Sequence, residues 1–346
     1  MQSAPRPKPT TNPYIIMLSR TLDDERAIDS RHFTWRSALA GRVDVFHAHW
    51  PEILVSGASP LKKAARQVLF ALLLTKFALT RTAIVRTVHN LDFPTGISRR
   101  ERALLGLFDR MTHLRIRINP TTAIPPDQPC MTILHGHYRD WFSEVPVSCQ
   151  VPGHLAYFGL IRRYKGTEHL LRTFRAVPDE SGLTLAVAGK PSTPALAQEI
   201  AALAADDPRI TTTLRFLTDA EVVETVTRAE LVVLPYREMH NSGGALTALS
   251  LDRPVLVPDN AATRALSEEV GPGWVRTYTG ALEPEDLLGT EGGEPRRGSR
   301  PDLGARDWHE SARLHVLAFR EAARRARPRG LGVERRRGIP TYLWKK

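Results

Sequence analysis

Residues 234–258 read LPYREMHNSGGALTALSLDRPVLVP, and this stretch decides the fold. An apolar run over 231–235 predicts a strand, a helical pattern follows over 243–251, and a second apolar run over 255–258 predicts another strand. A strand, a glycine-containing turn, a helix and a second strand indicate a βαβ unit with parallel strands. A sheet built from such units is covered by helices on both faces.

The NSGG segment inside this stretch lies after a strand and directly before a helix. The backbone N–H groups of Ser242, Gly243 and Gly244 would cradle an anion there, aided by the positive end of the helix dipole. Asn241 directly precedes them in the sequence. The alternative is that the glycine pair merely closes a tight turn.

The same alternation runs along the whole chain. We predict strands over 43–46, 82–88, 114–118, 131–134, 154–158, 183–189, 231–235 and 255–258. Helical patterns lie near 60–80, 98–110, 166–176, 194–205, 219–229, 243–251 and 261–269. This order predicts an α/β fold with strands enough for two parallel sheets.

A length of 346 residues also favours two domains of about 100–200 residues each. Proline recurs in EVPVSCQVPGH just before a new strand, and LLGTEGGEPRRGSRPDLGA is too rich in Gly, Pro and charge to pack. We therefore predict a disordered lead over 1–11, domains over 12–148 and 149–286, a flexible linker over 287–305, an amphipathic helix over 306–326 capped by Asp307, and a basic tail over 327–346.

The composition excludes several classes of protein. Cys130 and Cys149 are the only cysteines, so neither a disulfide framework nor a four-cysteine zinc site can form, and a reducing cytoplasm fits best. The N-terminal segment has no apolar core of the kind that a secretory signal needs. The net charge is +11, but Arg320 to Lys346 holds ten Lys or Arg and two Glu, which gives +8 of it. The excess is therefore a property of the tail, which is either solvated or in contact with anionic lipid.

The helix predicted over 60–80 has two interpretations. Lys62, Lys63, Arg66, Lys76 and Arg81 flank its apolar stretch, which is too short and too charged to span a bilayer. One interpretation is a helix that covers the sheet. The other is a monotopic surface that lies on a membrane.

Three histidine-bearing loops follow predicted strands of the first domain: HAHWPE (47–52), TVHNLDFP (87–94) and ILHGHYRDWF (133–142). Ligands of parallel sheets bind beyond the carboxyl ends of the strands, so these loops should converge on one edge. For each histidine alone, a structural role is the alternative. A zinc site is disfavoured because no helix has the required His spacing and no acidic cluster accompanies the loops.

The second domain opens with FGLIRRYKG (158–166), a strand followed by a short basic loop. Gly159 lets the backbone approach a ligand, and Arg162 and Lys165 can reach one diphosphate from neighbouring positions. The alternative is a solvated basic loop.

Taken in order, HAHWPE, TVHNL, ILHGHY, FGLIRRYKG and PYREMHNSGGALTALSLDRPVLVP resemble the GT-B glycosyltransferases, and the resemblance covers residues 12–280. It implies two Rossmann-like domains facing one another, the acceptor side first and the nucleotide-sugar side second, with the C-terminal helix crossing back onto the first domain. Within the superfamily the chain is similar to bacterial exopolysaccharide transferases of the xanthan-type β-1,4-mannosyltransferase group.

The chain departs from the family pattern in the donor loop. Many retaining members carry two glutamates separated by seven residues, whereas here Glu238 is present and the second position falls near Thr247. NPY (12–14) replaces the glycine-rich loop that often opens the first domain. Whether transfer inverts or retains the anomeric configuration stays open. No Asp-x-Asp triplet occurs, so we expect a metal-independent hexosyltransferase.

The resemblance assigns donor roles in the second domain. Breaking a sugar–phosphate bond leaves negative charge on the diphosphate. We expect Arg162, Lys165 and the 242–244 amides to stabilise that charge, with Asn241 nearby and Glu238 bound to sugar hydroxyls. The donor is then a nucleotide-diphosphate sugar, and no cofactor is expected.

The first domain receives the acceptor roles. An inverting enzyme needs a base for the acceptor hydroxyl, and His89 and Asp92 are the two candidates. Trp50 offers a stacking face for a sugar ring. The remaining acceptor-side candidates are His49, Glu52, His135 and His137.

We therefore expect a cytoplasmic transferase of polysaccharide or glycoconjugate synthesis, with a saccharide or lipid-linked acceptor, at the inner face of the plasma membrane when the acceptor is lipid-linked. No nucleic-acid partner is expected. Two alternatives remain: a non-catalytic sugar-nucleotide or saccharide-binding protein on the same fold, and a nucleic-acid or membrane scaffold built on the basic tail.

Overall fold

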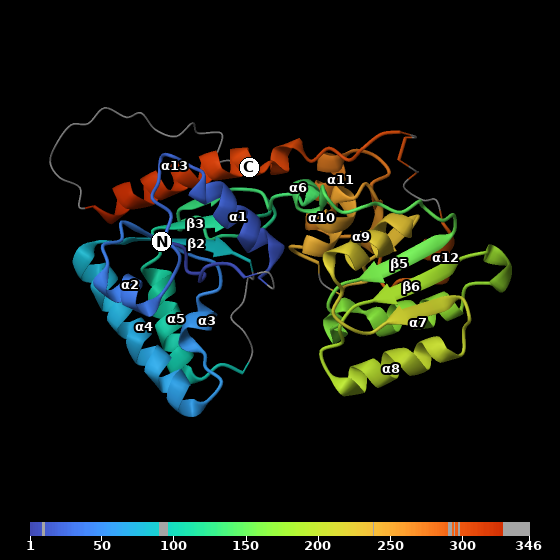
Figure 1. The fold of residues 1–346 in the computed structure, drawn as a ribbon, viewed down its shortest axis with the longest axis horizontal. Helices are drawn as coiled ribbons and strands as arrows, with labels where there is room; N and C mark the ends of the chain where they lie inside the picture. The colour runs from blue at the N-terminus through green and yellow to red at the C-terminus, as the bar shows by residue number, and fades with distance from the viewer. Residues whose placement is uncertain are drawn as a thin grey trace. The chain divides into compact units, whose positions relative to one another are not determined.

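The computed structural model describes residues 1–8, 11–89, 96–237, 239–289, 293, 295–296 and 298–327. The chain divides into two compact units, one formed by Met1–Gly136 with Arg306–Lys346 and the other by His137–Ala305. Each unit is built on its own parallel sheet (Figure 1). The predicted α/β class with two parallel sheets is confirmed.

The sheet of the first unit has the strand order β1-β2-β3-β4. Its strands are β1 (Val45–Ala48), β2 (Ala83–Val88), β3 (Leu114–Arg117) and β4 (Cys130–Thr132). Its helices are α1 (Pro13–Asp23), α2 (Trp35–Ala40), α3 (Glu52–Val55), α4 (Pro60–Thr80), α5 (Arg99–Arg110) and α13 (Trp308–Ala326). Helices α13 and α1 lie on one face of the sheet, and α4 and α5 lie on the other (Figure 1).

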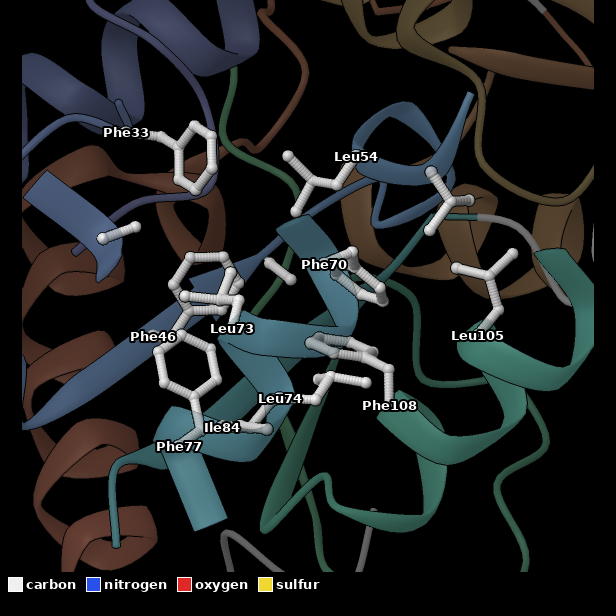
Figure 2. Close-up of a cluster of buried hydrophobic side chains, with 13 residues drawn as sticks. Phe33, Phe46, Leu54, Phe70, Leu73, Leu74, Phe77, Ile84, Leu105 and Phe108 are labelled. Carbon is white, nitrogen blue, oxygen red and sulfur yellow. The ribbon is translucent and has the colours of Figure 1, made fainter. Parts of the chain in front are cut away.

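The core of the first unit lies between α4, α5 and the sheet (Figure 2). Helix α4 presents Phe70, Leu73, Leu74 and Phe77 at helical spacing, and all four are buried. The ring of Phe77 packs on that of Phe46 of β1, with the ring centroids 4.9 Å apart. The interpretation of this helix as a sheet cover therefore holds for its inner face.

The sheet of the second unit has the strand order β10-β9-β8-β5-β6-β7. Its strands are β5 (His154–Phe158), β6 (Thr184–Ala188), β7 (Ile210–Thr213), β8 (Leu231–Val233), β9 (Val255–Pro258) and β10 (Val275–Tyr278). Its helices are α6 (Arg139–Phe142), α7 (Thr167–Arg175), α8 (Pro194–Ala205), α9 (Asp219–Arg228), α10 (Gly243–Ser250), α11 (Ala261–Val270) and α12 (Pro284–Leu288). Helices α7 and α8 cover one face of the sheet, and α9, α10 and α11 cover the other (Figure 1). Short 3₁₀ turns occupy Arg163–Lys165, Asp179–Ser181 and Gly304–Arg306.

Helix α13 returns the chain to the first unit, as predicted. The predicted N-cap is confirmed, because the Asp307 side chain accepts hydrogen bonds from the backbone N–H groups of His309 and Glu310. Helix α13 packs along β2 and against α1. It therefore covers a face of the first sheet.

Two strands at sheet edges were not predicted. β7 reads ITTT and β10 reads VRTY, and neither has the apolar run that marks a buried strand. Both lie at the outer edges of the sheet, where one side of the strand has no neighbour. Helix α1, also not predicted, begins after Asn12, whose side chain accepts from the Tyr14 backbone N–H.

The expected disordered lead and flexible linker differ from the structure. Gln2 forms a parallel bridge with His47 at the edge of β1, and the Ser3 backbone N–H donates to the His47 carbonyl, so this part of the lead extends the first sheet. In the linker, Leu303 is buried, and Arg300 forms an ion pair with Asp252 at 2.8 Å. Tertiary contacts thus order parts of two segments whose composition predicts disorder.

The break between the units lies at Gly136 and His137, whereas the predicted domain boundary lies at residue 148. The backbone N–H of Tyr138 donates to Ser250 Oγ of α10 at 2.8 Å. Arg139 forms an ion pair with Asp252 at 3.2 Å. These contacts attach residues 137–148 to the second unit.

Candidate functional site

The predicted donor loop of the second unit is held by close backbone packing. Gly166, which ends the basic loop after β5, has a φ of +69°, and a Cβ there would lie 2.1 Å from the carbonyl oxygen of Pro235. At Gly189, after β6, a Cβ would lie 1.7 Å from the carbonyl oxygen of Gly159. No other residue type fits at these two positions, so the loops after β5, β6 and β8 are fixed against one another.

Lys165 is the most perturbed cation of this loop. Burial, with a further contribution from Arg162, lowers the pKa of the Lys165 ammonium to about 8. Its Nζ atom lies 4.8 Å from the ring centroid of the buried Tyr236. The intervening Arg163 is committed to carboxylates instead, with ion pairs of 3.0 Å to both Glu168 and Glu199. Neither Arg162 nor Lys165 forms an ion pair with any carboxylate that the structure describes, so both can serve an anion.

Tyr236 also contacts the predicted anion cradle. Helix α10 begins at Gly243, and its N-cap Ser242 accepts a hydrogen bond from the Ala245 backbone N–H at 3.1 Å. A Cβ at Gly244 would lie 3.2 Å from the Tyr236 hydroxyl oxygen. The Lys165 ammonium therefore lies over the ring of Tyr236, and the first turn of α10 lies at its hydroxyl group. A cation and the positive end of a helix placed together form a site suited to a phosphate.

The two other donor candidates are Asn241 and Glu238. Asn241 is half-buried beside the cap of α10. Glu238 lies outside the described residues.

In the first unit, the three predicted loops converge. His49 follows β1 and His89 follows β2, and the Nδ1 atom of His49 lies 3.1 Å from the Nε2 atom of His89. Tyr14 of α1 packs against both rings and against His135, with centroid distances of 5.9, 5.3 and 4.5 Å. Trp50 stacks on His89, with centroids 4.2 Å apart and an interplanar angle of 20°. We call His49, His89, His135, Trp50 and Tyr14 the histidine cluster.

A second set of side chains packs against the histidine cluster. The Nε2 atom of His47, inside β1, lies 2.7 Å from Thr87 Oγ1, and its ring lies 5.4 Å from that of His315 of α13. Trp308, the first residue of α13, packs on Tyr14 at 5.7 Å. A Cβ at Gly136 would lie 2.4 Å from the Trp308 ring, so a glycine is required there. Helix α13 thus helps to fix the ring positions of the cluster.

Burial keeps the imidazoles of the cluster neutral. It lowers the pKa of His49 to about 3 and that of His135 to about 4, and it holds the pKa of His89 well below its usual range. His315 adds to the effect on His49, and His49 adds to the effect on His89, because each would be a neighbouring positive charge. At neutral pH these rings are uncharged.

One hydrogen-bond chain orients the His89 ring. The His49 Nε2 atom lies 3.3 Å from the Gln2 amide oxygen, which can only accept, so His49 carries its proton on Nε2. The Nδ1 atom of His49 must then accept from the Nε2–H group of His89. A neutral His89 with its proton on Nε2 has its lone pair on Nδ1. The chain therefore specifies which nitrogen of His89 can act as a base.

The remaining acceptor candidates have separate positions. Glu52 is the first residue of α3, and burial raises the pKa of its carboxyl group. His137 belongs to the second unit, where its Nδ1 atom accepts from the Arg139 backbone N–H at 3.3 Å, and its acceptor role stays a prediction. Asp92 lies outside the described residues.

The described residues contain no group of three or more His, Cys, Asp or Glu side chains placed to hold a metal ion. Within the same part of the chain, none of the helices has the length and hydropathy required to cross a bilayer.

Sequence patterns missed several members of the cluster and its support. The predicted strand, 43–46, ends two residues before β1 does, so it leaves His47 outside the strand. His315 lies on the apolar face of α13, in line with Trp308 and Phe319, and this position was a signal that it is buried. No pattern indicated that Tyr14 or Gln2 would reach the histidines, because both depend on tertiary packing.

Comparison with known proteins agrees with the fold. Residues 152–285, inside the second unit, match the model of the family described as glycosyl transferases group 1. A GDP-mannose:glycolipid 4-β-D-mannosyltransferase of Xanthomonas campestris pv. campestris is 45% identical over 92% of this chain and 91% of its own length. A second protein of that name and species is 44% identical over the same shares.

Solved structures support the fold alone. AviGT4, a glycosyltransferase involved in avilamycin A biosynthesis, superposes with a TM-score of 0.55 at 15% identity over 93% of this chain and 97% of that one. The Anabaena protein HepE, solved with UDP and glucose, gives a TM-score of 0.50 at 15% identity over 80% and 75%. Together with the extended identity to the Xanthomonas proteins, this places the chain among the GT-B glycosyltransferases, in the family that contains the GDP-mannose:glycolipid 4-β-D-mannosyltransferases.

Proposed function

We propose that this glycosyltransferase moves mannose from GDP-mannose to a hydroxyl of a lipid-linked saccharide, with inversion at the anomeric carbon. The observation that carries the proposal is the 45% identity, over nine-tenths of both chains, to a GDP-mannose:glycolipid 4-β-D-mannosyltransferase. The residues of each unit also suit one part of this reaction.

The second unit binds the donor. The diphosphate of GDP-mannose is held by the Lys165 ammonium, the Arg162 guanidinium and the first-turn N–H groups of α10. As the bond between the anomeric carbon and the phosphate oxygen breaks, the diphosphate gains negative charge, and these groups stabilise it without a metal ion. We assign Asn241 and Glu238 to hydroxyl groups of the donor.

The stereochemistry calls for a base. GDP-mannose carries its phosphate in the α configuration, so a β-mannosyl product requires attack from the opposite face of the sugar. The acceptor oxygen bonds to the anomeric carbon, GDP leaves with the electron pair of the broken bond, and the acceptor hydroxyl loses its proton to a base. A neutral imidazole with a defined lone pair meets this need.

His89 is the base in this proposal, and its Nδ1 atom receives the proton. The hydrogen bond from its Nε2–H group to His49, and from His49 to Gln2, fixes that tautomer. Trp50, stacked on the His89 ring, offers its other face to a sugar ring. His49, His135 and Glu52 orient the acceptor, and Asp92 is the alternative base.

The cellular setting follows from the acceptor. We infer a role in exopolysaccharide or glycoconjugate synthesis, at the cytoplasmic face of the membrane where a lipid-linked saccharide and a nucleotide sugar meet.

The test is transfer of radiolabelled mannose from GDP-mannose to lipid-linked saccharides extracted from bacterial membranes, in excess chelator. UDP-glucose and GDP-glucose serve as matched donors. We expect GDP-mannose to be used in preference to both, with chelator present. Transfer from another donor alone, or GDP-mannose bound without turnover on any extracted acceptor, would contradict the proposal.

A further inference from the structure

Helix α4 is apolar on two opposite faces, and the sheet accounts for only one of them. Its inner face holds the buried residues Phe70, Leu73, Leu74 and Phe77. Its outer face carries Leu61, Val68, Leu72 and Leu79, which are 82%, 60%, 53% and 80% exposed. A helix that only covered a sheet would be polar on this outer side.

The exposed residues form one straight stripe. Leu61, Ala65, Val68, Leu72 and Leu79 follow one another at steps of four, three, four and seven residues, which places them within about 60° of the helix circumference. The stripe runs for about 27 Å along α4. Ile53 of α3, which packs beside α4, is 58% exposed and extends it.

The stripe and Ile53 account for five of the six exposed large hydrophobic side chains that the structure describes in the first unit. Among described residues, every exposed large hydrophobic side chain of the first unit lies on α3, α4 or α5. Those of the second unit are distributed over separate loops and elements: Val147, Val151, Leu160, Tyr164, Phe216 and Leu288. A concentration on one continuous face is typical of an interaction surface.

The charges beside the stripe are positive. From residue 57 to residue 82 the chain contains five Lys or Arg and no Asp or Glu. Lys62 and Arg81 at the two ends of α4 are exposed, and so are Arg99, Arg100 and Arg102 in the first turn of α5.

The two carboxylates of α5 are already paired with other cations. Glu101 is buried and pairs with Lys63 at 2.6 Å, and Asp109 pairs with Arg86 and Arg115 at 2.7 and 2.9 Å. Lys76 is also withdrawn from the surface, because its ammonium donates to the Ala38 carbonyl at 2.6 Å and to that of Gly41. The outward-facing charge of α4 and of the first turn of α5 is therefore cationic.

We propose that this surface, formed by the α4 stripe, Ile53 and the flanking cations, lies on an anionic lipid bilayer. The inference deepens the proposed function, because a lipid-linked acceptor places the reaction at a bilayer. Aliphatic side chains enter the boundary between headgroups and acyl chains, while Lys and Arg contact anionic headgroups. A protein partner fits less well, since the cores of protein interfaces are depleted in charge and enriched in aromatic residues, and the exposed residues of α4 include no aromatic side chain.

The first test is flotation of the full chain with vesicles of phosphatidylcholine alone or mixed with an equimolar amount of phosphatidylglycerol. We expect binding to the mixed vesicles and little to phosphatidylcholine. Val68→Gln with Leu72→Gln should lower binding to the mixed vesicles by about tenfold or more, because two aliphatic side chains no longer enter the bilayer. Phe216→Gln with Leu288→Gln, two exposed hydrophobics of the second unit, is the matched control and should bind as the wild type does.

A second set of variants separates the stripe from the basic tail. Arg335→Gln with Arg336→Gln and Arg337→Gln removes three charges from the tail of the full chain. Loss of binding in this variant, with full binding in the stripe variant, would overturn the proposal. A concentration-dependent dimer that the stripe substitutions dissociate, without vesicle binding, would overturn it as well and assign the face to a second copy.

Activity distinguishes this inference from the proposed function. With a water-soluble acceptor, the stripe variant should keep the turnover of the wild type, and with the same saccharide on a lipid in vesicles it should lose activity in proportion to its binding. Vesicle binding by a chain that transfers no sugar would sink the proposed function and leave the surface intact. Equal activity of the stripe variant and the wild type on the embedded acceptor would contradict the surface alone.

Discussion

The Nδ1 atom of His49 lies 3.1 Å from the Nε2 atom of His89, and these two residues follow adjacent parallel strands of the first sheet. Because His49 is also bonded to Gln2, the proton between the two rings belongs to His89. A histidine pair with one defined hydrogen-bond arrangement thus lies at the carboxyl edge of this sheet.

Replacing the proposed base should reduce turnover and leave donor binding unchanged. We expect His89→Gln to lower kcat by about 10²–10⁴, the usual contribution of a positioned base. The Kd for GDP should stay within twofold, because the donor residues lie in the other unit. His169→Gln, at an exposed histidine of the second unit, is the control. A decrease of only a few-fold in kcat would point to Asp92, or to retention of configuration.

Turnover should depend on the side-chain amide of Gln2, which sets the tautomer of His49. Gln2→Leu removes the acceptor for His49, so His49 no longer has to carry its proton on Nε2 and the orientation of His89 is lost. We expect a lower kcat with the KM for GDP-mannose unchanged, and partial recovery in Gln2→Asn. An equal loss in both variants, accompanied by a lower melting temperature, would indicate a structural role for Gln2.

Lys165 should make donor binding depend on pH. In the proposed function the ammonium binds the diphosphate. Its pKa is lowered to about 8 by burial, so the affinity for GDP should fall above pH 8 by up to tenfold per pH unit. Lys165→Arg stays charged and should remove this dependence. Lys165→Ala should weaken GDP binding at pH 7 by about 1.5–3 kcal/mol, while Lys190→Ala at an exposed position should not. Titration calorimetry from pH 7 to 9.5 measures both effects, and a flat profile for the wild type would remove Lys165 from the site.

The buried histidines should make the fold sensitive to acid. The pKa of His49 is lowered to about 3, and those of His135 and His315 to about 4, in each case chiefly by burial. Between pH 6.5 and 4 the unfolded chain binds protons that the folded chain refuses, so the free energy of unfolding falls as the pH falls, by about 1.4 kcal/mol per pH unit for each such histidine. Above pH 6.5 the effect is absent.

Urea denaturation measured between pH 7 and 5 tests this. In His315→Gln the slope of unfolding free energy against pH should be shallower by about one histidine's share, about 1.4 kcal/mol per pH unit. Identical slopes in the two proteins would show that His315 ionises alike in both states.

Two glycines of the first unit should respond oppositely to alanine. At Gly136 a Cβ would lie 2.4 Å from the Trp308 ring, so Gly136→Ala should displace α13 from the cluster and destabilise the fold by about 1–3 kcal/mol. Gly106 lies inside α5 with nothing within 4 Å of the Cβ position, so Gly106→Ala should stabilise it by about 0.5–1 kcal/mol. Thermal denaturation compares the two, and a neutral Gly136→Ala would contradict the close packing of Trp308.

The convergence of His49, His89 and His135 could be predicted because it depends on one regularity: the carboxyl ends of parallel strands meet at one edge of the sheet. The start of α10 at Gly243 was predictable for a similar reason, since its cap and glycines are local signals. In both cases the sequence neighbours of a residue determine its place.

Other features of the site depend on contacts that no local pattern encodes. Tyr14 lies on α1 and His315 lies on α13, about 300 residues apart in the sequence, and only the packing of α1 on α13 brings both to neighbouring histidine rings. His137 was assigned to the wrong unit because the chain passes from one unit to the other between Gly136 and His137, within a single predicted loop. Gln2 reaches His49 only because its own backbone pairs with His47 at the edge of the sheet.

The most direct test is the anomeric configuration of the product that the purified protein forms from GDP-mannose and a lipid-linked saccharide. The one-bond carbon–proton coupling at the new anomeric carbon, measured by NMR on a ¹³C-labelled product, distinguishes the two anomers. Inversion assisted by His89 predicts a β-linked mannose that forms in excess chelator and is lost in His89→Gln. An α-linked mannose, or a β-linked product formed at the wild-type rate by that variant, would contradict it.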